Sequence, residues 1–163
     1  MMLSLPSLRT ATTMLALVSL AACSKKSEDT PTPTPPAATT GVTYTVDGAA
    51  VTATTSGATV VGNQIIVSGV SGTGTANKGV LLTLPKATGT YTLSATSNED
   101  ATYLASGNTS DFYESTSGSI VVTTYAASTT TGASNIAGTF TFTGKNSANA
   151  TKTVTNGTFN VKY

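Results

Sequence analysis

The chain has 163 residues, with one cysteine, no histidine, 9% charged residues and a formal net charge of +1. Without histidine it has neither a Ser-His-Asp triad nor a histidine-ligated zinc site. A near-neutral chain with no basic stripe also argues against nucleic acid as a partner.

The first 22 residues have the organisation of a secretory signal peptide. Arg9 supplies a positive charge, Met14–Leu20 an apolar run, and Ala21-Ala22 the small residues before a cut. The run is too short for a transmembrane helix, which needs about 20 apolar residues. Leu20-Ala21-Ala22-Cys23 resembles the lipobox of bacterial lipoproteins. The resemblance implies that residues 1–22 are removed and that Cys23 carries the membrane-anchoring acyl chains; the alternative is an ordinary signal peptide with an accidental cysteine.

Residues 23–40 contain this cysteine and a Pro/Thr-rich tether. The four prolines between residues 31 and 36 favour polyproline II. The seventeen residues from Ser24 to Thr40 can reach on the order of 50 Å. We therefore expect a protein attached to the bacterial cell envelope, at the outer membrane. The acidic pair Glu28-Asp29 is short, which leaves both the periplasmic face and the cell surface open.

Residues 41–163 are expected to form a single all-β domain. Thr, Val, Ile, Tyr and Phe occur in short alternating runs with turn-forming residues between them, and no helical periodicity follows the signal. This pattern favours an antiparallel β-sandwich or a small open β-barrel. The predicted strands are Val42–Val46, Ala50–Thr54, Gln64–Val70, Gly79–Leu84, Thr90–Ala95, Ala101–Leu104, Ser119–Tyr125, Ala137–Thr143 and Thr151–Tyr163.

Residue parity predicts which side of each strand faces the core. Phe140 and Phe142 share an inner face, with threonines at the positions between and beside them. The segment Ile65–Val67 is apolar on both faces, which suggests a central strand. The other predicted inward residues are Tyr44, Val46, Val80, Leu82, Leu84, Phe159, Val161 and Tyr163.

Two short Gly-containing segments indicate how the strands connect. Asp47-Gly48 is typical of a two-residue hairpin turn. Asn156-Gly157 carries the same signal, but parity changes there, so either a turn or a one-residue bulge fits. We favour the bulge, within one long C-terminal hairpin whose loop is Lys145–Ala150. That register places Gly138 opposite Gly157.

The C-terminal half also resembles a known family. The segments SGSIVVTTY, IAGTFTFTGKN and TVTNGTFNVKY, in that order behind a lipobox, resemble an uncharacterised family of Bacteroidota lipoproteins, the domain-of-unknown-function family 6252. VDGAAVTA and GTYTL fit the same pattern, and the resemblance covers most of Val42–Tyr163. It implies a fold and not an activity. The family has no established substrate or catalytic residues, so no site residue is transferred.

Acidic and aromatic residues gather in two polar segments, SNEDATY and NTSDFYES. The acidic side chains are open to three interpretations: solvated loop charges, a calcium site, or acid–base catalysis. They lack a regular Asp-x-Asp spacing, so we expect solvated charges, no metal and no cofactor. The weak calcium candidates are Glu99, Asp100, Asp111 and Glu114, with Asn98 and Asn108 beside them. The aromatic residues either bind a sugar or close the end of a β-core. These weak ligand-binding candidates are Tyr103, Phe112 and Tyr113.

Taken together, these features favour a non-catalytic binding or structural module that contacts a glycan or an envelope protein through loops or an edge strand. The alternative is a small barrel that encloses an apolar ligand, as lipocalins do. A filled interior favours the module, and a lined cavity favours the carrier. A carboxylate-based hydrolase comes third, because neither histidine nor a free thiol is available. The oligomeric state is left open.

Overall fold

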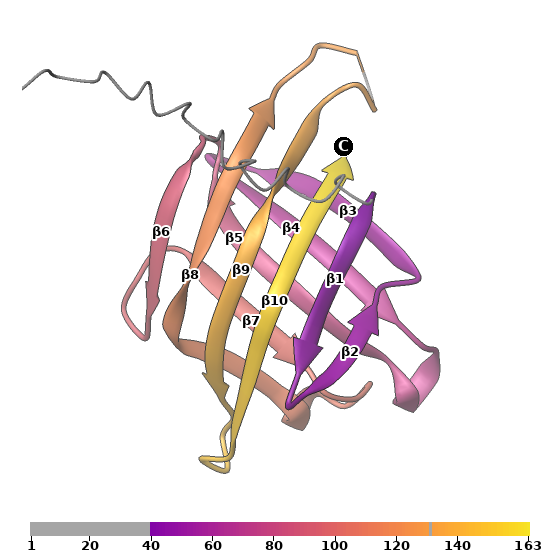
Figure 1. The fold of residues 1–163 in the computed structure, drawn as a ribbon, viewed down its shortest axis with the longest axis vertical. Coiled ribbons are helices and arrows are strands. Elements are labelled where there is room, and N and C mark those ends of the chain that lie inside the picture. Colours follow the sequence, from indigo (N-terminus) through magenta and orange to yellow (C-terminus); the bar gives the residue numbers. More distant parts are fainter. Residues whose placement is uncertain (1–39, 131) are drawn as a thin grey trace, which may run out of the picture. The chain divides into compact units, whose positions relative to one another are not determined.

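The computed structural model describes residues 40–130 and 132–163, and their regular structure is β-strand apart from two 3-10 helices (Figure 1). The strands are β1 (Gly41–Val46), β2 (Ala49–Thr52), β3 (Thr55–Val61), β4 (Gln64–Ser71), β5 (Lys78–Pro85), β6 (Gly89–Ser94), β7 (Asp100–Leu104), β8 (Phe112–Ala126), β9 (Asn135–Lys145) and β10 (Thr151–Lys162). The 3-10 helices are η1 (Gly74–Ala76) and η2 (Thr109–Asp111). The predicted signal peptide, Cys23 and nearly all of the tether lie outside the described residues.

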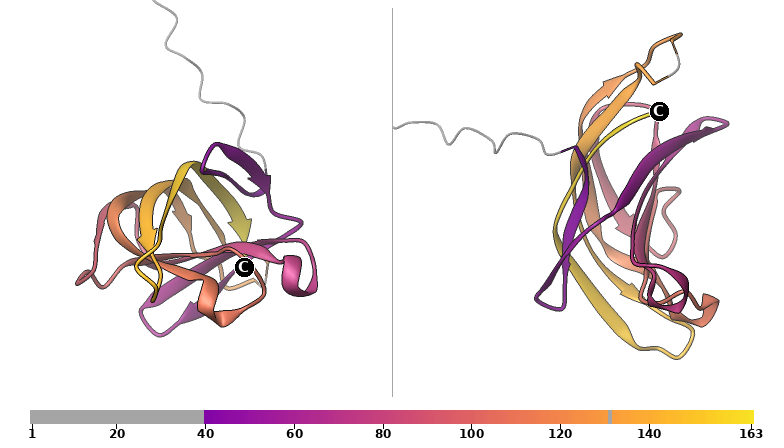
Figure 2. Two further views of the ribbon diagram at one scale, coloured as in Figure 1. Left: turned by 90° about the horizontal axis from the view of Figure 1, so that it is seen from below. Right: turned by 90° about the vertical axis from the view of Figure 1, so that its right-hand side faces the viewer.

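The ten strands form one antiparallel sheet that curls over itself. The order is β2-β1-β10-β9-β8-β7-β5-β4-β3, and β6 pairs with β8 beside β7. Figure 2 shows β1, β10, β9 and β8 on one side of the interior and β3, β4, β5 and β7 on the other. The result is a half-barrel, which confirms the all-β prediction and fits both a sandwich and an open barrel.

Apolar side chains from both sides fill the interior. Phe140 and Phe142 are 3% and 2% exposed, whereas Thr139 and Thr141 face solvent, as parity predicts. The twenty buried hydrophobic residues are Val42, Tyr44, Val46, Ile65, Val67, Val80, Leu82, Leu84, Leu93, Ala101, Tyr103, Tyr113, Ile120, Val122, Ile136, Phe140, Phe142, Val154, Phe159 and Val161. Nine of the ten predicted inward residues are among them, and Tyr163 packs half-buried against this core.

Both hairpin features take the conformations that their residues favour. Asp47 and Gly48 have φ of 47° and 84°, which confirms the two-residue turn between β1 and β2. Asn156 has φ of 51°, and the β9–β10 ladder shifts between Val154 and Gly157, so this site is a bulge within one strand. An extra residue there reverses the parity of β10, and residues on both sides of it reach the core.

The predicted register of this hairpin is wrong by two residues. Gly157 lies opposite Phe140, and Gly138 lies opposite Phe159. The predicted hairpin pairs residue 145 with residue 150, whereas in the structure Lys145 pairs with Thr151. The bulge then adds one more residue to β10, which accounts for the second residue of the difference.

This corrected register places a phenylalanine ring over each glycine. A Cβ on Gly157 would lie 2.5 Å from the Phe140 ring, and one on Gly138 would lie 2.7 Å from the Phe159 ring and 2.0 Å from the Val121 carbonyl oxygen. No side chain fits at either position. The two glycines therefore let the rings lie directly on the backbone, a device that supports strong curvature in a sheet.

The sequence prediction missed two stretches of strand. β3 (Thr55–Val61) is an edge strand whose only ladder is with β4, and it is partly exposed on both faces, so its residues show no alternation. The first half of β8 was expected to be loop. It contains Glu and Ser, and its ladder shifts between Ser115 and Ser117, which breaks the alternation there.

The strand that contains Ile65–Val67 is not central. β4 is next to the edge strand β3, although it pairs along its length with β5 on its other side. Ile65 and Val67 are fully buried in the core, while Ile66 is half-buried on the outer face. The apolar triplet therefore reflects partial cover of the outer face, and not a position in the middle of the sheet.

We expect Phe140→Ala to lower the free energy of unfolding by about 3–5 kcal/mol, because the ring is buried and its loss leaves a cavity. Thr141→Ala, on the exposed face, should cost about 1 kcal/mol or less, including the hydroxyl bond that Thr141 donates to the Val154 carbonyl. Urea unfolding of both variants measures the two changes. Comparable losses would mean that the outer face of β9 is also covered.

Two glycine variants test the curvature argument. Gly138→Ala should destabilise the protein by about 1–3 kcal/mol or more, since the new methyl group must displace backbone and ring atoms. Gly57→Ala is the matched control, because nothing lies within 4 Å of its Cβ position. We expect that variant to be neutral or to gain about 0.4–1 kcal/mol. Equal effects in thermal unfolding would contradict the proposed role of Gly138.

Candidate functional site

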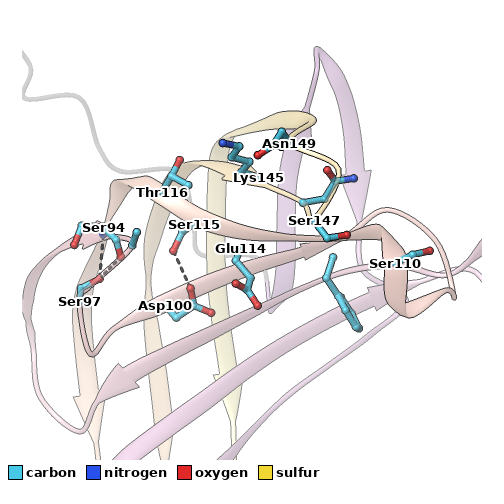
Figure 3. Close-up of a pocket in the computed structure, with 13 residues that line it drawn as sticks. Ser94, Ser97, Asp100, Ser110, Glu114, Ser115, Thr116, Lys145, Ser147 and Asn149 are labelled. Atoms are coloured by element: carbon cyan, nitrogen blue, oxygen red, sulfur yellow. Dashed lines mark hydrogen bonds between the residues drawn. The ribbon is translucent and has the colours of Figure 1, made fainter.

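A hollow of about 630 Å³ lies where the start of β7, the start of β8 and the end of β9 meet (Figure 3). The loops that follow β6 and β9 complete its walls. Most of its lining residues have polar side chains, and Phe112 is the one aromatic residue. The lining residues are Ser94, Ala95, Ser97, Asp100, Ser110, Phe112, Glu114, Ser115, Thr116, Lys145, Asn146, Ser147 and Asn149.

The hollow forms where β8 changes partners. Residues 112–114 of β8 pair with β7, whereas residues 117–122 pair with β6 on the same edge. Between these two stretches the β8–β9 ladder is irregular, with a shift between Ser115 and Ser117. We call this change of partner, from β7 to β6, the fork. It leaves backbone groups of β7 without a ladder partner, and such groups need another hydrogen-bonding partner when they are buried.

Ser115 and Asp100 satisfy the polar groups at this fork. Ser115 is 4% exposed; its hydroxyl accepts a bond from the Ala101 N–H at 3.2 Å and donates to Asp100 Oδ1 at 2.9 Å. The Thr102 hydroxyl donates to Asp100 Oδ2 at 2.9 Å. Both oxygens of the Asp100 carboxylate are thus engaged in holding the fork together, which gives this residue a structural role.

Glu114 and Lys145, by contrast, are free. They face each other directly across the β8–β9 ladder, and both side chains are exposed. Neither side chain forms a hydrogen bond or an ion pair with another described residue. Phe112 lies two residues before Glu114, so both occupy the outer face of β8, and Phe112 is 36% exposed.

The loop after β9 holds the upper wall of the hollow in a fixed shape. Asn146 Oδ1 accepts bonds from the N–H groups of Ala148 and Ala150 at 3.1 and 2.9 Å, and the Asn146 N–H donates to the Ala150 carbonyl. Asn149 takes a left-handed conformation with φ of 66°. Ser147 and Asn149 thereby line the hollow beside Lys145.

The structure separates the four acidic candidates. Asp100 and Glu114 line the hollow, whereas Glu99 and Asp111 do not. The Asp111 carboxylate accepts a bond from the Ser106 hydroxyl. Within residues 40–130 and 132–163, no group of three or more acidic, cysteine or histidine side chains is arranged to hold a metal ion.

The three aromatic candidates also have different positions. Tyr103 and Tyr113 lie in the core, 2% and 7% exposed, with ring centroids 6.1 Å apart. Burial raises the pKa of Tyr103, so its hydroxyl stays neutral at physiological pH. Of the three, Phe112 alone lines the hollow.

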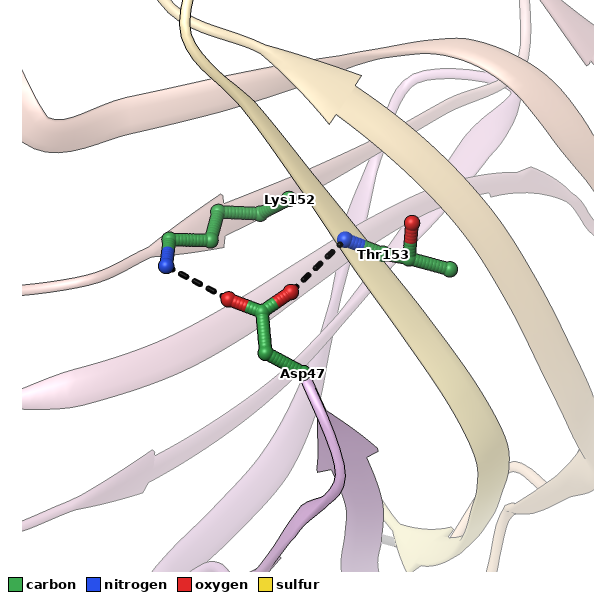
Figure 4. Close-up of polar contacts among 3 residues, drawn as sticks. All are labelled: Asp47, Lys152 and Thr153. Carbon is green, nitrogen blue, oxygen red and sulfur yellow. Dashed lines mark hydrogen bonds and ion pairs between the residues drawn. The ribbon is translucent and has the colours of Figure 1, made fainter.

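An ion pair at the β1–β2 turn was not anticipated. Lys152 Nζ lies 2.5 Å from Asp47 Oδ2, and Asp47 Oδ1 accepts a bond from the Thr153 N–H at 3.4 Å (Figure 4). The pair fixes the turn to β10. Lys152 lies on the same side of β10 as the buried Val154. A lysine at such an inward position near a strand end is the feature of the sequence from which a partner for its charge could have been predicted.

A second hollow, of about 600 Å³, lies on the outer face around the bulge of β10. Thr139, Thr141, Thr155 and Thr158 line it with Asn156 and neighbouring residues of β8. In the sequence, the alternating threonines of β9 indicate this hydroxyl-rich surface. Threonine is also a good strand former on a solvent-exposed face, and the Thr43 and Thr158 hydroxyls bond across strands at 2.8 Å, so the surface has a structural explanation.

The Asp47–Lys152 pair predicts a pH dependence. The hydrogen bond from Lys152, followed by that from Thr153, lowers the pKa of Asp47 below 3.8. A lowered pKa means that the stabilisation is present above the unfolded value of about 3.9 and is lost as the pH falls through the folded value. We expect Asp47→Asn to be less stable than the natural chain at about pH 6, and we expect this difference to shrink as the pH falls below about 3.9.

Thermal unfolding across this pH range provides the measurement. Asparagine still suits the turn, so the variant isolates the charge. Lys152→Gln should reproduce the loss near neutral pH, and the double variant should lose no more than either single one. A stability difference that persists unchanged at about pH 2 would exclude the ion pair as its cause.

Comparisons with known proteins place the chain in a family without adding a site. Searches of curated proteins and of solved structures give no match. Within the described residues, no helix has the length and hydropathy needed to cross a membrane. A family model, described as a domain of unknown function, matches residues 38–161, and the chain therefore belongs to the domain-of-unknown-function family 6252.

Proposed function

We propose that this protein is a non-catalytic binding module of the bacterial cell envelope, anchored at the outer membrane through lipids on Cys23. Its partner is a glycan or an envelope protein bound in the hollow between β7, β8 and β9. One observation carries the proposal. The Asp100 carboxylate is hydrogen-bonded within the fold, whereas the side chains of Glu114, Lys145 and Phe112 line the hollow and are available to a ligand.

The position of the hollow supports display from a membrane. Gly41, which follows the tether, pairs with Asn160 of β10, and Lys145 pairs with Thr151 of the same strand. Asn160 follows Thr151 by nine positions along β10, which span about 30 Å in a strand. The hollow therefore lies at the end of the sheet opposite to the start of β1, and a chain anchored before Gly41 presents it away from the attachment point.

The filled interior favours this module over a carrier of an apolar ligand. The twenty core residues are at most 7% exposed, and the Phe140 and Phe159 rings lie against the backbone of the neighbouring strand. A carrier needs an apolar cavity that opens to solvent. The two hollows described above are lined mainly by residues outside this core.

A carboxylate-based hydrolase is the second candidate, because Asp100 and Glu114 line the same hollow. Glycoside hydrolysis needs one carboxyl group as an acid and another as a base or nucleophile. Both Asp100 oxygens accept hydroxyl bonds from Thr102 and Ser115 within the fold, and Glu114 is exposed. Asp100 is therefore already occupied by structural contacts, which places the hydrolase behind the binding module.

The anchor is tested by metabolic labelling with a palmitate analogue in the bacterial host. We expect label in the natural chain and none in Cys23→Ser, with Ser24→Ala as the matched control that keeps its label. The natural chain should fractionate with the outer membrane. Equal labelling of all three chains would overturn the proposed anchor.

The binding role is tested with residues 24–163, which retain every described strand. We expect this chain to retain envelope material in a pull-down and to show no turnover on a panel of glycosidase and esterase substrates. Glu114→Gln should weaken the capture and leave folding unchanged. Turnover that disappears in Glu114→Gln would favour the hydrolase instead.

A further inference from the structure

The free side chains of the hollow match the chemistry of a sugar ring. We infer that the hollow binds one ring of a neutral saccharide, with two neighbouring hydroxyl groups on Glu114 and Lys145 and an apolar ring face on Phe112. This inference rests on the proposed binding function and names its ligand class. It requires no metal and no movement of the fold.

The strand geometry brings these three groups to one surface. Glu114 and Lys145 are opposite each other in the β8–β9 ladder, and Cβ atoms in such pairs lie about 4.5–5.5 Å apart on the same face. Phe112 and Glu114 are two residues apart along β8, about 7 Å on that face. A surface of this size suits a single ring better than an extended chain.

The hydrogen-bonding roles of Glu114 and Lys145 are complementary. A carboxylate only accepts hydrogen bonds, and an ammonium group only donates them. A hydroxyl group does both, so one hydroxyl of a vicinal pair can donate to Glu114 while its neighbour accepts from Lys145. Because both residues lack partners among the described residues, neither loses an internal bond when the sugar binds.

The charge of the hollow argues for a neutral ligand. Asp100 and Glu114 carry two negative charges and Lys145 carries one positive charge. The hollow is therefore negative by one unit, which disfavours phosphate and carboxylate ligands. Ser110, Ser147 and Asn149 add uncharged polar groups around the rim, as is usual for sites that fix the orientation of a polar ligand.

Phe112 has the exposure that a stacking platform needs. Its side chain is 36% exposed, although the sheet around it buries most other aromatic rings. The negative face of an aromatic ring attracts the positively polarised C–H groups of an apolar sugar face. Phe112 is thus the aromatic side chain of the hollow that a ligand there can contact.

The test is an NMR titration of isotope-labelled residues 24–163 with the methyl glycosides of glucose, galactose, mannose and N-acetylglucosamine. At least one glycoside should shift the amide signals of residues 110–116 and 145–149. Tetrahydropyran, which has the ring but no hydroxyl group, should cause no such shifts at equal concentration. Phe112→Ala, Glu114→Gln and Lys145→Met should each weaken binding about tenfold. Phe112→Ala and Lys145→Met each remove a contact, and Glu114→Gln replaces a charge-assisted hydrogen bond with a weaker neutral one.

Matched controls separate the site from the rest of the surface. Leu81→Ala removes an apolar side chain of similar exposure, 39%, and Lys162→Met removes an exposed lysine outside the hollow. Both should bind as the natural chain does. Shifts elsewhere on the surface, or hollow variants that bind unchanged, would overturn the saccharide site.

Failure of the inference can be distinguished from failure of the proposed function. If no glycoside binds, but capture of envelope material is lost in Glu114→Gln, the ligand class is wrong and the binding module stands. If the glycosides bind and Cys23→Ser is still labelled, the site stands and the anchor is wrong. If neither glycosides nor envelope material bind, both proposals fail.

Discussion

The packing of two phenylalanine rings onto two glycines is the constraint on which the rest of the structure depends. Phe140 of β9 lies over Gly157 of β10, and Phe159 of β10 lies over Gly138 of β9, both on the inner face of the β9–β10 ladder. Because neither glycine has a Cβ, the long strands can curve tightly around the core. The bulge at Asn156 then changes the parity of β10, so that both of its halves contribute apolar side chains to one interior.

This curvature also determines where the hollow forms. β8 cannot follow both sides of a curled sheet with one partner, so it pairs first with β7 and then with β6. At the fork the Ser115 hydroxyl accepts from the Ala101 N–H and donates to the Asp100 carboxylate. The hollow is therefore a consequence of the fold, and its free residues, Glu114 and Lys145, are those that the fork does not use.

Short-range patterns in the sequence predicted the fold class, the turn at Asp47-Gly48, the bulge at Asn156-Gly157 and the inward faces, because alternation and turn residues act locally. They did not predict β3, which is an edge strand without a consistently buried face. Nor did they pair Glu114 with Lys145 in the hollow, because these residues are 31 positions apart and their meeting depends on the β8–β9 register. The bulge at Asn156-Gly157 was predicted, but the register of β10 was not, because it also depends on where the loop between β9 and β10 closes.

The division of polar side chains into engaged and free ones has a consequence for affinity. Asp47, Asp100 and Asp111 are hydrogen-bonded within the fold, whereas Glu114 and Lys145 form no ion pair with each other. A pair at such an exposed position would contribute only about 0–1 kcal/mol. An exposed, shallow site with few contacts binds a single ligand weakly. Under the proposed lipid anchoring, many copies on one membrane would raise the effective concentration of such sites and give avidity without new contacts. A small neutral domain of this kind therefore suits repeated weak contacts with a repetitive partner better than tight capture of one molecule.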